Sequence, residues 1–293
     1  MRILLIGNTG QVGWELQRTL CPMGEIIALD YPAVDLLDLD RTRKLISQIQ
    51  PQAIINAAAY TDVDHAETEQ ELAFGVNATA PGWLAEEARK IGAVFVHYST
   101  DYVFDGGKVT AYTEKDLPKP INVYGKSKLA GEQLVEAADG AYLIFRTSWV
   151  YSLRKKSFVT QVLRWGREQK EMRVVDDQVG SPTWCRLLAE VTAQILAKAN
   201  GKLLERVSER KGIYHLAGKG SANRYEWAMS ILTNDPQKDQ QIVERIQPAK
   251  SIDFPTSAGR PANSSLACEK ISDVFGVHLP AWNELLPLAL SNS

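Results

Sequence analysis

A turn rich in glycine near the start of the chain is the feature that most strongly limits the possible folds. Residues 2–6 form a short apolar run, typical of a strand buried on both faces, and residues 14–20 have helical periodicity. Between them lies Gly7-Asn-Thr-Gly10-Gln-Val-Gly13. Gly7 can make the tight turn, Gly10 lets a pyrophosphate approach the backbone, and Gly13 permits close packing of helix on strand. The spacing is GxxGxxG rather than GxGxxG, and a purely structural turn is the alternative. The order strand, turn, helix favours anion binding.

Strand and helix patterns alternate along the first half of the chain, with short connections between them. Strands are predicted at 25–30, 53–59, 93–99 and 142–148, and helices at 40–49, at 72–91 with Pro81 inside it, and around Lys128. This alternation is typical of an α/β protein with a Rossmann-type doubly wound parallel sheet.

Beyond Trp149 the alternation becomes less regular, and six prolines interrupt the last sixty residues. Helices are expected at 158–169 and 187–199, a strand at 173–176, and one more strand of the main sheet at 212–217. We therefore expect a smaller α/β C-terminal lobe for the substrate. The predicted division is a dinucleotide-binding domain over 1–150, with 184–218 returning to it, and a substrate-binding lobe formed by 151–183 and 219–293.

Composition and charge argue against several classes of partner. Lys and Arg number 33 against 35 for Asp and Glu, and no basic block is present, so neither nucleic acid nor a membrane surface is expected as a partner. No run approaches the roughly 20 apolar residues that span a bilayer, and the apolar start is too short for a signal peptide. Cys21, Cys185 and Cys268 are far apart and suit reduced thiols, which favours a cytoplasmic protein.

The nucleotide end of the predicted site is indicated by Asp30, which ends the second strand about 20 residues after the glycine turn. A carboxylate there can accept a ribose hydroxyl, and it favours NADH because it would repel a 2′-phosphate. No Arg or Lys follows before Arg41, but Arg18 and Arg41 leave NADPH open as the cofactor. Asp38 and Leu39 are expected near the adenine. The full predicted set is Gly7, Thr9, Gly10, Gln11, Val12, Gly13, Asp30, Asp38, Leu39, Thr61 and, beside the nicotinamide, Ala57, Ala58 and Ala59.

The reactive residues are predicted around Tyr124 and Lys128, which lie four positions apart and share one face if their segment is helical. An ammonium beside a phenol would lower the pKa of the tyrosine, which otherwise titrates near ~10. A solvated helix face with a chance Tyr and Lys is the alternative. Thr100 and Asp101 end a predicted strand, and ligands of open α/β sheets bind at that edge, although turn chemistry also favours these residues.

Several motifs together resemble one enzyme family. GxxGxxG, a threonine at a strand end and Tyr-x-x-x-Lys look like an extended short-chain dehydrogenase/reductase. More narrowly, the chain resembles the dTDP-4-dehydrorhamnose reductase family from about residue 1 to 270. The blocks that carry this resemblance are Asn56-Ala-Ala-Ala-Tyr-Thr61, Ser99-Thr-Asp-Tyr-Val-Phe-Asp-Gly106, Asn122-Val-Tyr-Gly-Lys-Ser-Lys-Leu-Ala-Gly-Glu132, Arg146-Thr-Ser-Trp-Val-Tyr151, Asp177-Gln-Val-Gly-Ser-Pro-Thr183 and Arg260-Pro-Ala-Asn-Ser264.

The resemblance implies reduction of the C4 ketone of dTDP-4-dehydro-L-rhamnose to dTDP-L-rhamnose by NADPH or NADH. Tyr124 would donate the proton, Thr100 a hydrogen bond, and Lys128 would hold the nicotinamide ribose, so that Tyr124 and Lys128 also contact the cofactor. The residues implied for contact with the dTDP-sugar are Val63, Asp101, Tyr102, Phe104, Trp149, Gln178, Arg260 and Asn263. For Phe104 and Trp149, ordinary core packing is the alternative.

The resemblance leaves assembly and two other functions open. Glu15 and Glu190 match positions at which some family members hold magnesium at a dimer contact, but solvated helix faces are expected here, and no metal is expected in the chemical step. A monomer or a homodimer is therefore predicted. After Leu266 the tail reads Ala267-Cys268, which departs from the family pattern. The alternatives are another nucleotide-sugar reductase or epimerase, and a regulatory subunit that binds NADP without turnover.

Overall fold

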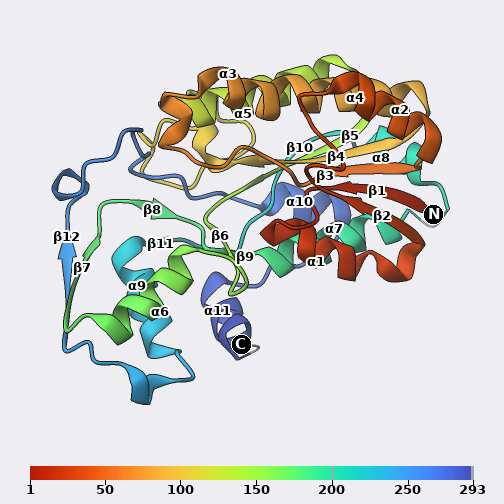
Figure 1. Ribbon diagram of the computed structural model, residues 1–293. Helices are drawn as coiled ribbons and strands as arrows, with labels where there is room; N and C mark the ends of the chain where they lie inside the picture. The colour runs from red at the N-terminus through yellow and green to blue at the C-terminus, as the bar shows by residue number, and fades with distance from the viewer. Residues whose placement is uncertain (200, 292–293) are drawn as a thin grey trace.

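The computed structural model describes residues 1–199 and 201–291, and a six-stranded parallel sheet forms its centre. The strand order is β10-β5-β4-β3-β1-β2 (Figure 1). The strands are β1 (Arg2–Ile6), β2 (Glu25–Leu29), β3 (Ala53–Asn56), β4 (Val94–Thr100), β5 (Ala141–Thr147) and β10 (Gly212–His215). The predicted doubly wound sheet is confirmed. Because the chain moves from β1 to β2 on one side and to β3 on the other, a crevice is expected at the carboxyl ends of β1 and β3.

Two layers of helices cover the sheet, and each buries its own apolar cluster. One face packs against α2 (Leu39–Ile49), α3 (Gln70–Phe74), α4 (Ala80–Lys90) and α5 (Val123–Ala137), as Figure 1 shows. The other packs against α1 (Gln11–Thr19), α7 (Cys185–Ala197), α8 (Leu203–Glu209) and α10 (Glu269–Phe275). Within the segment 184–218, β10 pairs with β5 at the edge of the main sheet, and the predicted division into domains stays a prediction.

The predicted helix over 72–91 is interrupted by one π-helical turn, Gly75–Thr79, between α3 and α4. Pro81 lacks an N–H and cannot donate to the carbonyl of Asn77, which favours such a break. The Asn77 side chain donates to Tyr60 O (2.9 Å) and Ser127 Oγ (3.1 Å) and accepts from Tyr60 N (2.9 Å). The π-helical turn therefore connects α5 to the loop after β3 through the Asn77 side chain.

The remaining elements form a smaller lobe with its own apolar cluster. It contains α6 (Phe158–Glu168), α9 (Arg224–Thr233) and α11 (Trp282–Leu290), and the parallel pair β7 (Glu171–Val175) and β12 (Arg245–Ala249). Shorter pairs are β6 (Val150–Tyr151) with β9 (Thr183–Trp184) and β8 (Val179–Gly180) with β11 (Ala222–Asn223). The 3₁₀ helices of the chain are η1 (Cys21–Met23), η2 (His65–Glu67), η4 (Asp101–Val103), η5 (Lys238–Gln240) and η6 (Ser251–Asp253).

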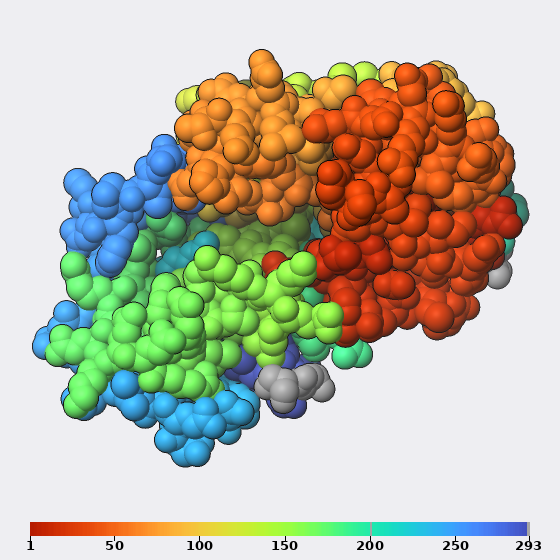
Figure 2. All heavy atoms as spheres, viewed as in Figure 1, coloured from red at the N-terminus to blue at the C-terminus, as the bar shows by residue number. Residues whose placement is uncertain are grey.

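A hollow separates the two parts on the face shown in Figure 2, between the red and orange atoms above and the green atoms below. The helix α10 lies within the predicted lobe range 219–293, but its Ile271 belongs to the core of the main sheet. Among the described residues, no helix is long and apolar enough to cross a membrane.

Buried His215 makes the stability of the fold sensitive to acid. Its Nδ1 lies 3.1 Å from both Tyr112 O and Ala267 O, so Nδ1 carries the hydrogen, and Nε2 is buried without a partner among the described residues. Burial, with Arg146 nearby, lowers the pKa of His215 to about 3 from 6.5. The folded chain resists a proton that the unfolded chain accepts below pH 6.5, so stability is lost as the pH falls below that value.

We predict that His215→Asn, which keeps a donor for the two carbonyls but cannot be protonated, reduces this loss. Relative to the variant, the wild type should lose about 1.4 kcal/mol per pH unit below its unfolded pKa, or about 2 kcal/mol by pH 5. Urea unfolding at pH 7.5 and pH 5 measures the difference. Equal pH dependence of the two proteins would contradict the assignment.

Candidate active site

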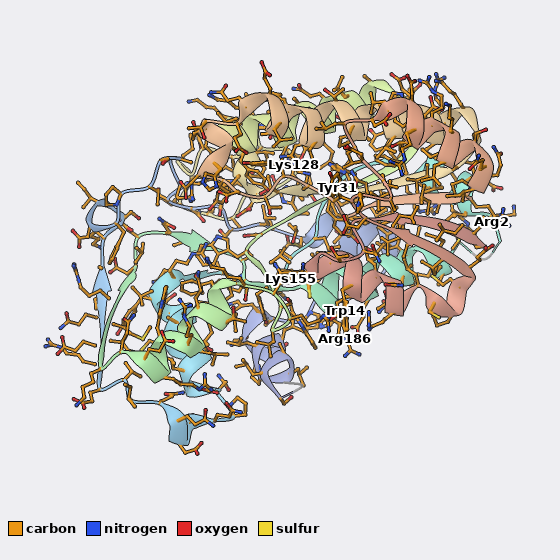
Figure 3. All side chains as sticks on the ribbon, viewed as in Figure 1. Arg2, Trp14, Tyr31, Lys128, Lys155 and Arg186 are labelled. Carbon is orange, nitrogen blue, oxygen red and sulfur yellow. The ribbon has the colours of Figure 1, made fainter. Side chains whose placement is uncertain are left out.

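A cavity of about 580 Å³ opens at the carboxyl ends of β1, β3, β4 and β5, between the sheet and the lobe. It collects most of the residues predicted from the sequence. Those that line it are Gly7, Thr9, Gly10, Gln11, Val12, Asp30, Ala57, Ala58, Ala59, Thr61, Thr100, Asp101, Tyr124, Lys128 and Trp149. In Figure 3, Lys128 and Tyr31 lie on the sheet side of the gap and Lys155 on the lobe side.

The glycine turn has the tight geometry that its sequence predicts. Gly7 has a φ of +87°, and a Cβ there would lie 2.6 Å from Ala58 N. A Cβ on Gly13 would lie 2.0 Å from Gly7 O, so α1 can approach β1 only without a side chain at this position. Gly10 caps α1 in an extended conformation, and the only neighbour of a Cβ there would be Gly7 O at 3.3 Å. The free N–H groups of α1 therefore face an open cavity.

Asp30 follows β2, and its carboxylate holds the glycine turn in place through hydrogen bonds from Thr9. Its Oδ2 accepts from Thr9 N (3.1 Å) and Thr9 Oγ1 (2.5 Å), and its Oδ1 accepts from Tyr31 N (2.9 Å). Asp38 and Leu39 do not line this cavity. The Asp38 side chain caps α2 by accepting from Arg41 N (3.0 Å), and Leu39 packs against the core under α2. Their predicted contact with adenine stays a prediction.

The reactive trio, Thr100, Tyr124 and Lys128, lies where β4 ends and α5 begins. Asn122 caps α5 by accepting from Gly125 N at 2.7 Å, and a Cβ on Gly125 would lie 2.1 Å from Tyr102 O. This close approach brings Tyr124 to the end of β4, where a hydrogen bond joins it to Thr100. The Tyr124 ring also meets Tyr102 edge to face, with centroids 5.9 Å apart.

The predicted lowering of the Tyr124 pKa is wrong for this structure. Burial raises the pKa of Tyr124, and the hydrogen bond with Thr100 opposes that shift only in part. Lys128 Nζ instead donates to Tyr98 O (2.7 Å) and lies 3.1 Å from His97 Nε2. Burial lowers the pKa of Lys128 to about 8, with Glu132 acting in the opposite direction. At neutral pH the phenol therefore carries its proton.

A buried ion pair holds α5 to β5 behind the trio. Arg146 donates to Glu132 from Nε (2.9 Å) and from a terminal nitrogen (2.6 Å), and Ser99 Oγ donates to the same carboxylate (2.5 Å). Both side chains are almost fully buried. Removal of one partner from such a pair typically costs about 3–5 kcal/mol, so the pair strongly constrains where α5 sits.

Two of the predicted substrate contacts, Asp101 and Trp149, line the cavity. Burial raises the pKa of Asp101 to about 6, and hydrogen bonds from Ser264, Ser148 and Thr100 oppose the shift. Trp149 has a φ of +44°, unusual for a bulky residue and typical of strain held at a functional site. A Cβ on Gly180 would lie 2.3 Å from the Trp149 ring.

Phe104 is not among the residues that line the cavity, and its predicted substrate contact stays a prediction. Its side chain has no exposed surface and stacks on Tyr112 with centroids 4.2 Å apart, which makes it a core residue. Asn263 donates to Lys108 O (2.8 Å) and Thr110 O (3.1 Å), so its amide holds a loop.

The remaining predicted substrate contacts do not line the cavity in the described part of the chain. Gln178 donates to Ser251 Oγ at 2.9 Å, and Arg260 pairs with Asp64 at 2.7 Å. Val63 is half-buried in the loop before η2, and Tyr102 lies behind Tyr124. Their substrate contacts stay predictions.

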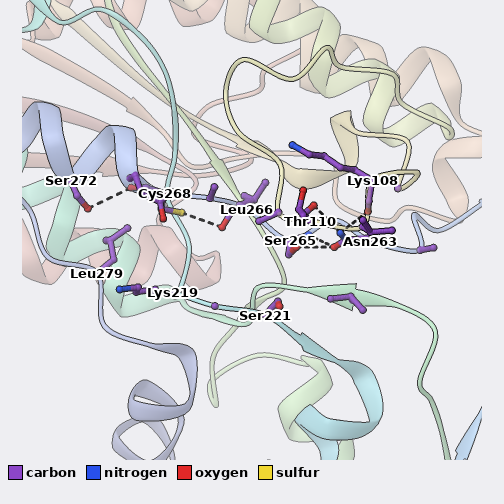
Figure 4. Close-up of a pocket in the computed structure, with 18 of the residues that line it drawn as sticks. Lys108, Thr110, Lys219, Ser221, Asn263, Ser265, Leu266, Cys268, Ser272 and Leu279 are labelled. Atoms are coloured by element: carbon purple, nitrogen blue, oxygen red, sulfur yellow. Dashed lines mark hydrogen bonds between the residues drawn. The ribbon is translucent and has the colours of Figure 1, made fainter.

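Asn263 lies on a second cavity, of about 1000 Å³, on the other side of the segment 262–266 (Figure 4). Asn263 and Ser265 face this second cavity, while the side chain of Ser264 between them bonds Asp101. Ala262 and Leu266 line the second cavity as well, so this segment borders the second cavity and reaches the active site through the Ser264 side chain.

Six cavity residues were missed from the sequence, namely Tyr98, Ser99, Thr147, Val150, Lys155 and Lys156. Lys155 and Lys156 reach the cavity from the loop after β6, and Thr147 ends β5 beside Thr100. The sequence carries a signal for the two lysines in the run Arg154-Lys-Lys156. It carries one for Thr147 in its place near the end of the strand predicted at 142–148. Gln11 Oε1 and Thr147 Oγ1 are buried oxygens without a hydrogen-bond partner in the part of the chain that the structure describes, and both residues line the cavity. These orphan groups fit a polar ligand such as a dinucleotide.

Glu15 and Glu190, the predicted low-probability magnesium positions, lie among arginines, and their role stays a prediction. Arg186 Nε donates to Glu190 at 2.7 Å, and Arg186, Arg18 and Arg154 all act on Glu15. Within residues 1–199 and 201–291, no group of three His, Cys, Asp or Glu side chains could hold a metal ion.

A doubly wound sheet whose glycine turn shares one cavity with Thr100, Tyr124 and Lys128 defines an extended short-chain dehydrogenase/reductase. Its fold is also that of Thermus thermophilus UDP-glucose 4-epimerase, with a TM-score of 0.78 at 20% identity. The family model described as RmlD substrate binding domain matches residues 1–293, and the chain belongs to this family of dTDP-4-dehydrorhamnose reductases.

Relatives cover nearly the whole chain. A dTDP-4-dehydrorhamnose reductase of Burkholderia thailandensis is 40% identical over 99% of this chain and 98% of its own length. That of Escherichia coli K12 is 39% identical over 96% and 94%. The solved structure of a Bacillus anthracis dTDP-4-dehydrorhamnose reductase in complex with NADP has a TM-score of 0.88 at 34% identity, covering 100% of this chain and 99% of that one.

We predict that Gly13→Ala and Gly10→Ala differ sharply in stability. The Gly13 variant forces a Cβ into the Gly7 carbonyl and should lose about 3 kcal/mol. The Gly10 variant meets only one atom, at 3.3 Å, and should lose about 1 kcal/mol or less. Urea unfolding of the two variants measures the difference, and equal losses would refute the proposed packing role of Gly13.

Proposed function

We propose that this chain reduces the C4 ketone of dTDP-4-dehydro-L-rhamnose to dTDP-L-rhamnose with NADPH or NADH, as a step of dTDP-rhamnose biosynthesis. The observation that carries the proposal is the meeting of Thr100, Tyr124 and Lys128 with the glycine turn in one cavity. Full-length similarity to reductases of that name supports the choice of substrate.

In this proposal the cofactor supplies a hydride to the C4 carbon, and the chain handles the charge that develops on the C4 oxygen. Tyr124 donates the proton, and its raised pKa keeps that proton in place at neutral pH until the oxygen becomes basic. Thr100, hydrogen-bonded to Tyr124, stabilises the same oxygen.

We assign the cofactor to the glycine turn, Asp30 and the loop Ala57–Ala59, with Lys128 at the nicotinamide ribose. Lys155 and Lys156 add positive charge to the same cavity, which suits the phosphates of either cofactor. The complex of the Bacillus anthracis relative with NADP is consistent with this assignment. We also propose the domain division predicted from the sequence, in which 1–150 with 184–218 binds the cofactor and 151–183 with 219–293 binds the substrate. We propose that the protein is cytoplasmic and is a monomer or a homodimer.

A coupled assay tests the reaction. The protein, a 3,5-epimerase, dTDP-4-dehydro-6-deoxyglucose and NADPH or NADH are combined, and absorbance of the reduced cofactor is followed. We expect the absorbance to fall only when the epimerase is present. Absence of consumption with both cofactors would exclude the reductase function, and consumption without the epimerase would indicate a different nucleotide sugar.

Tyr124→Phe tests the proton donor. We expect turnover to fall by about a hundredfold or more, the usual contribution of a general acid, while the dissociation constant of NADPH stays unchanged. Tyr142→Phe is a matched control, because the Tyr142 hydroxyl only approaches Glu136 (3.4 Å) on α5, and it should keep wild-type turnover. Unchanged turnover in the Tyr124 variant would remove this residue from the chemistry.

A further inference from the structure

The side chain of Lys128 is almost fully buried, although it lines the active-site cavity. Its Nζ lies within hydrogen-bond distance of two groups on β4, Tyr98 O at 2.7 Å and His97 Nε2 at 3.1 Å. Glu132, one turn further along α5, is already held by Arg146 through two hydrogen bonds. Among the described residues, no carboxylate lies within ion-pair distance of Lys128. The charge of the amine therefore depends on what His97 presents to it.

Asn56, on β3, determines which nitrogen of the His97 ring carries the hydrogen. Asn56 Oδ1 accepts from Ala58 N at 3.1 Å, so the amide is oriented with its Nδ2 toward His97 Nδ1, at 3.3 Å. A ring nitrogen that accepts this hydrogen bond has no hydrogen of its own, so the hydrogen of the neutral ring is assigned to Nε2. Burial, with Lys128 nearby, lowers the pKa of His97 well below 6.5, and the ring stays neutral. His97 thus presents an N–H to Lys128.

A hydrogen on His97 Nε2 suits an uncharged amine and not an ammonium. An ammonium has only donors, whereas an amine can accept from Nε2 and still donate to Tyr98 O. For His97 to accept from an ammonium, the ring hydrogen would have to move to Nδ1, where it would face the amide hydrogens of Asn56. A buried hydrogen bond would then be lost. This arrangement opposes the charge of Lys128, as does burial, which lowers the pKa of Lys128 to about 8.

The other titratable groups around Lys128 do not replace this effect. Burial raises the pKa of both Tyr98 and Tyr124, so these phenols are neutral. Glu132 favours the charged amine, but Arg146 pairs with its carboxylate at 2.6 Å. The remaining charged or titratable residues that line the cavity are Asp30, Asp101, Lys155 and Lys156. His97 is therefore the group in direct contact that distinguishes the two states of the amine.

We propose that His97, oriented by Asn56, is a positioning residue that keeps the amine of Lys128 uncharged in the free protein, and that Lys128 takes up a proton when the cofactor binds. The proton comes from solvent and adds to the lone pair of Nζ that accepted from Nε2. Ribose hydroxyls and negative phosphates favour the ammonium, which can then turn its hydrogens away from His97. Ala58, which orients Asn56, lines the same cavity. The proposal rests on the proposed function in placing Lys128 at the nicotinamide ribose.

Binding of NADPH to the full-length protein tests the proton uptake without any need for turnover. Calorimetry at pH 8.5 in two buffers of different ionisation enthalpy measures the protons taken up, and the phosphates of NADPH do not titrate at this pH. We expect the wild type to take up about half a proton or more. By linkage, its dissociation constant for NADPH should rise with pH above about 8, by up to about tenfold per pH unit. A wild type that takes up no proton overturns the proposal.

His97→Gln tests the role of the ring. The glutamine oxygen can accept from an ammonium, so the pKa of Lys128 in the free protein should rise by about one unit. Proton uptake at pH 8.5 should therefore fall to less than about half of the wild-type value, and the rise of the dissociation constant should begin about one pH unit higher. His278→Gln is the matched control, because it makes the same substitution at an exposed ring beside the second cavity, and it should behave as the wild type does.

A melting curve shows that each variant is folded. If His97→Gln does not fold, Asn56→Asp serves the same comparison, since a carboxylate would accept from Nδ1 and leave Nε2 free to accept from the ammonium. Wild-type proton uptake in the folded variant overturns the proposal, because a purely structural His97 would alter affinity or stability without altering the proton balance. Reduced uptake in the variant, together with no reduction of the dTDP-sugar by the wild type, supports the role of His97 and rejects the proposed reaction instead.

Discussion

The close contact of α5 with its neighbours is the constraint on which the active site depends. A Cβ on Gly125 would lie 2.1 Å from Tyr102 O, and one on Gly131 would lie 2.1 Å from Asn77 O. The helix is thus pressed against the turn after β4 at one glycine and against the π-helical turn at the other. Between them, the side chain of Lys128 reaches Tyr98 O. Tyr124 and Lys128 meet the end of β4 because no side chain separates the backbones.

Burial then determines what each polar group of the site can do. It raises the pKa of Tyr124, lowers that of Lys128 to about 8 and raises that of Asp101 to about 6. These shifts all disfavour the charged form, as expected where water is excluded. A tyrosine that keeps its proton suits donation to a developing alkoxide, and no lowered pKa is needed for reduction in that direction.

The fold was predictable from the sequence because its signals are local. Apolar runs, the glycine turn and helical periodicity located all six strands of the main sheet, and the rule that ligands bind at carboxyl strand ends placed Thr100, Asp101 and Tyr124 together. The partner of Lys128 was not predictable, because His97 and Tyr98 O come from a distant strand. The choice between substrate contact and core packing for Phe104 was not predictable, because its stacking on Tyr112 is a tertiary contact.

The segment 262–266 has a further consequence for how this protein can vary. Ser264 bonds Asp101 in the active site, while its neighbours Asn263 and Ser265 line the second cavity. The segment that lines the second cavity therefore also supplies a hydrogen bond to a residue that lines the first. Substitutions that reshape the second cavity will therefore shift the Ser264 hydroxyl, from which Asp101 accepts a hydrogen bond. The requirements of the active site thus limit which substitutions the second cavity tolerates.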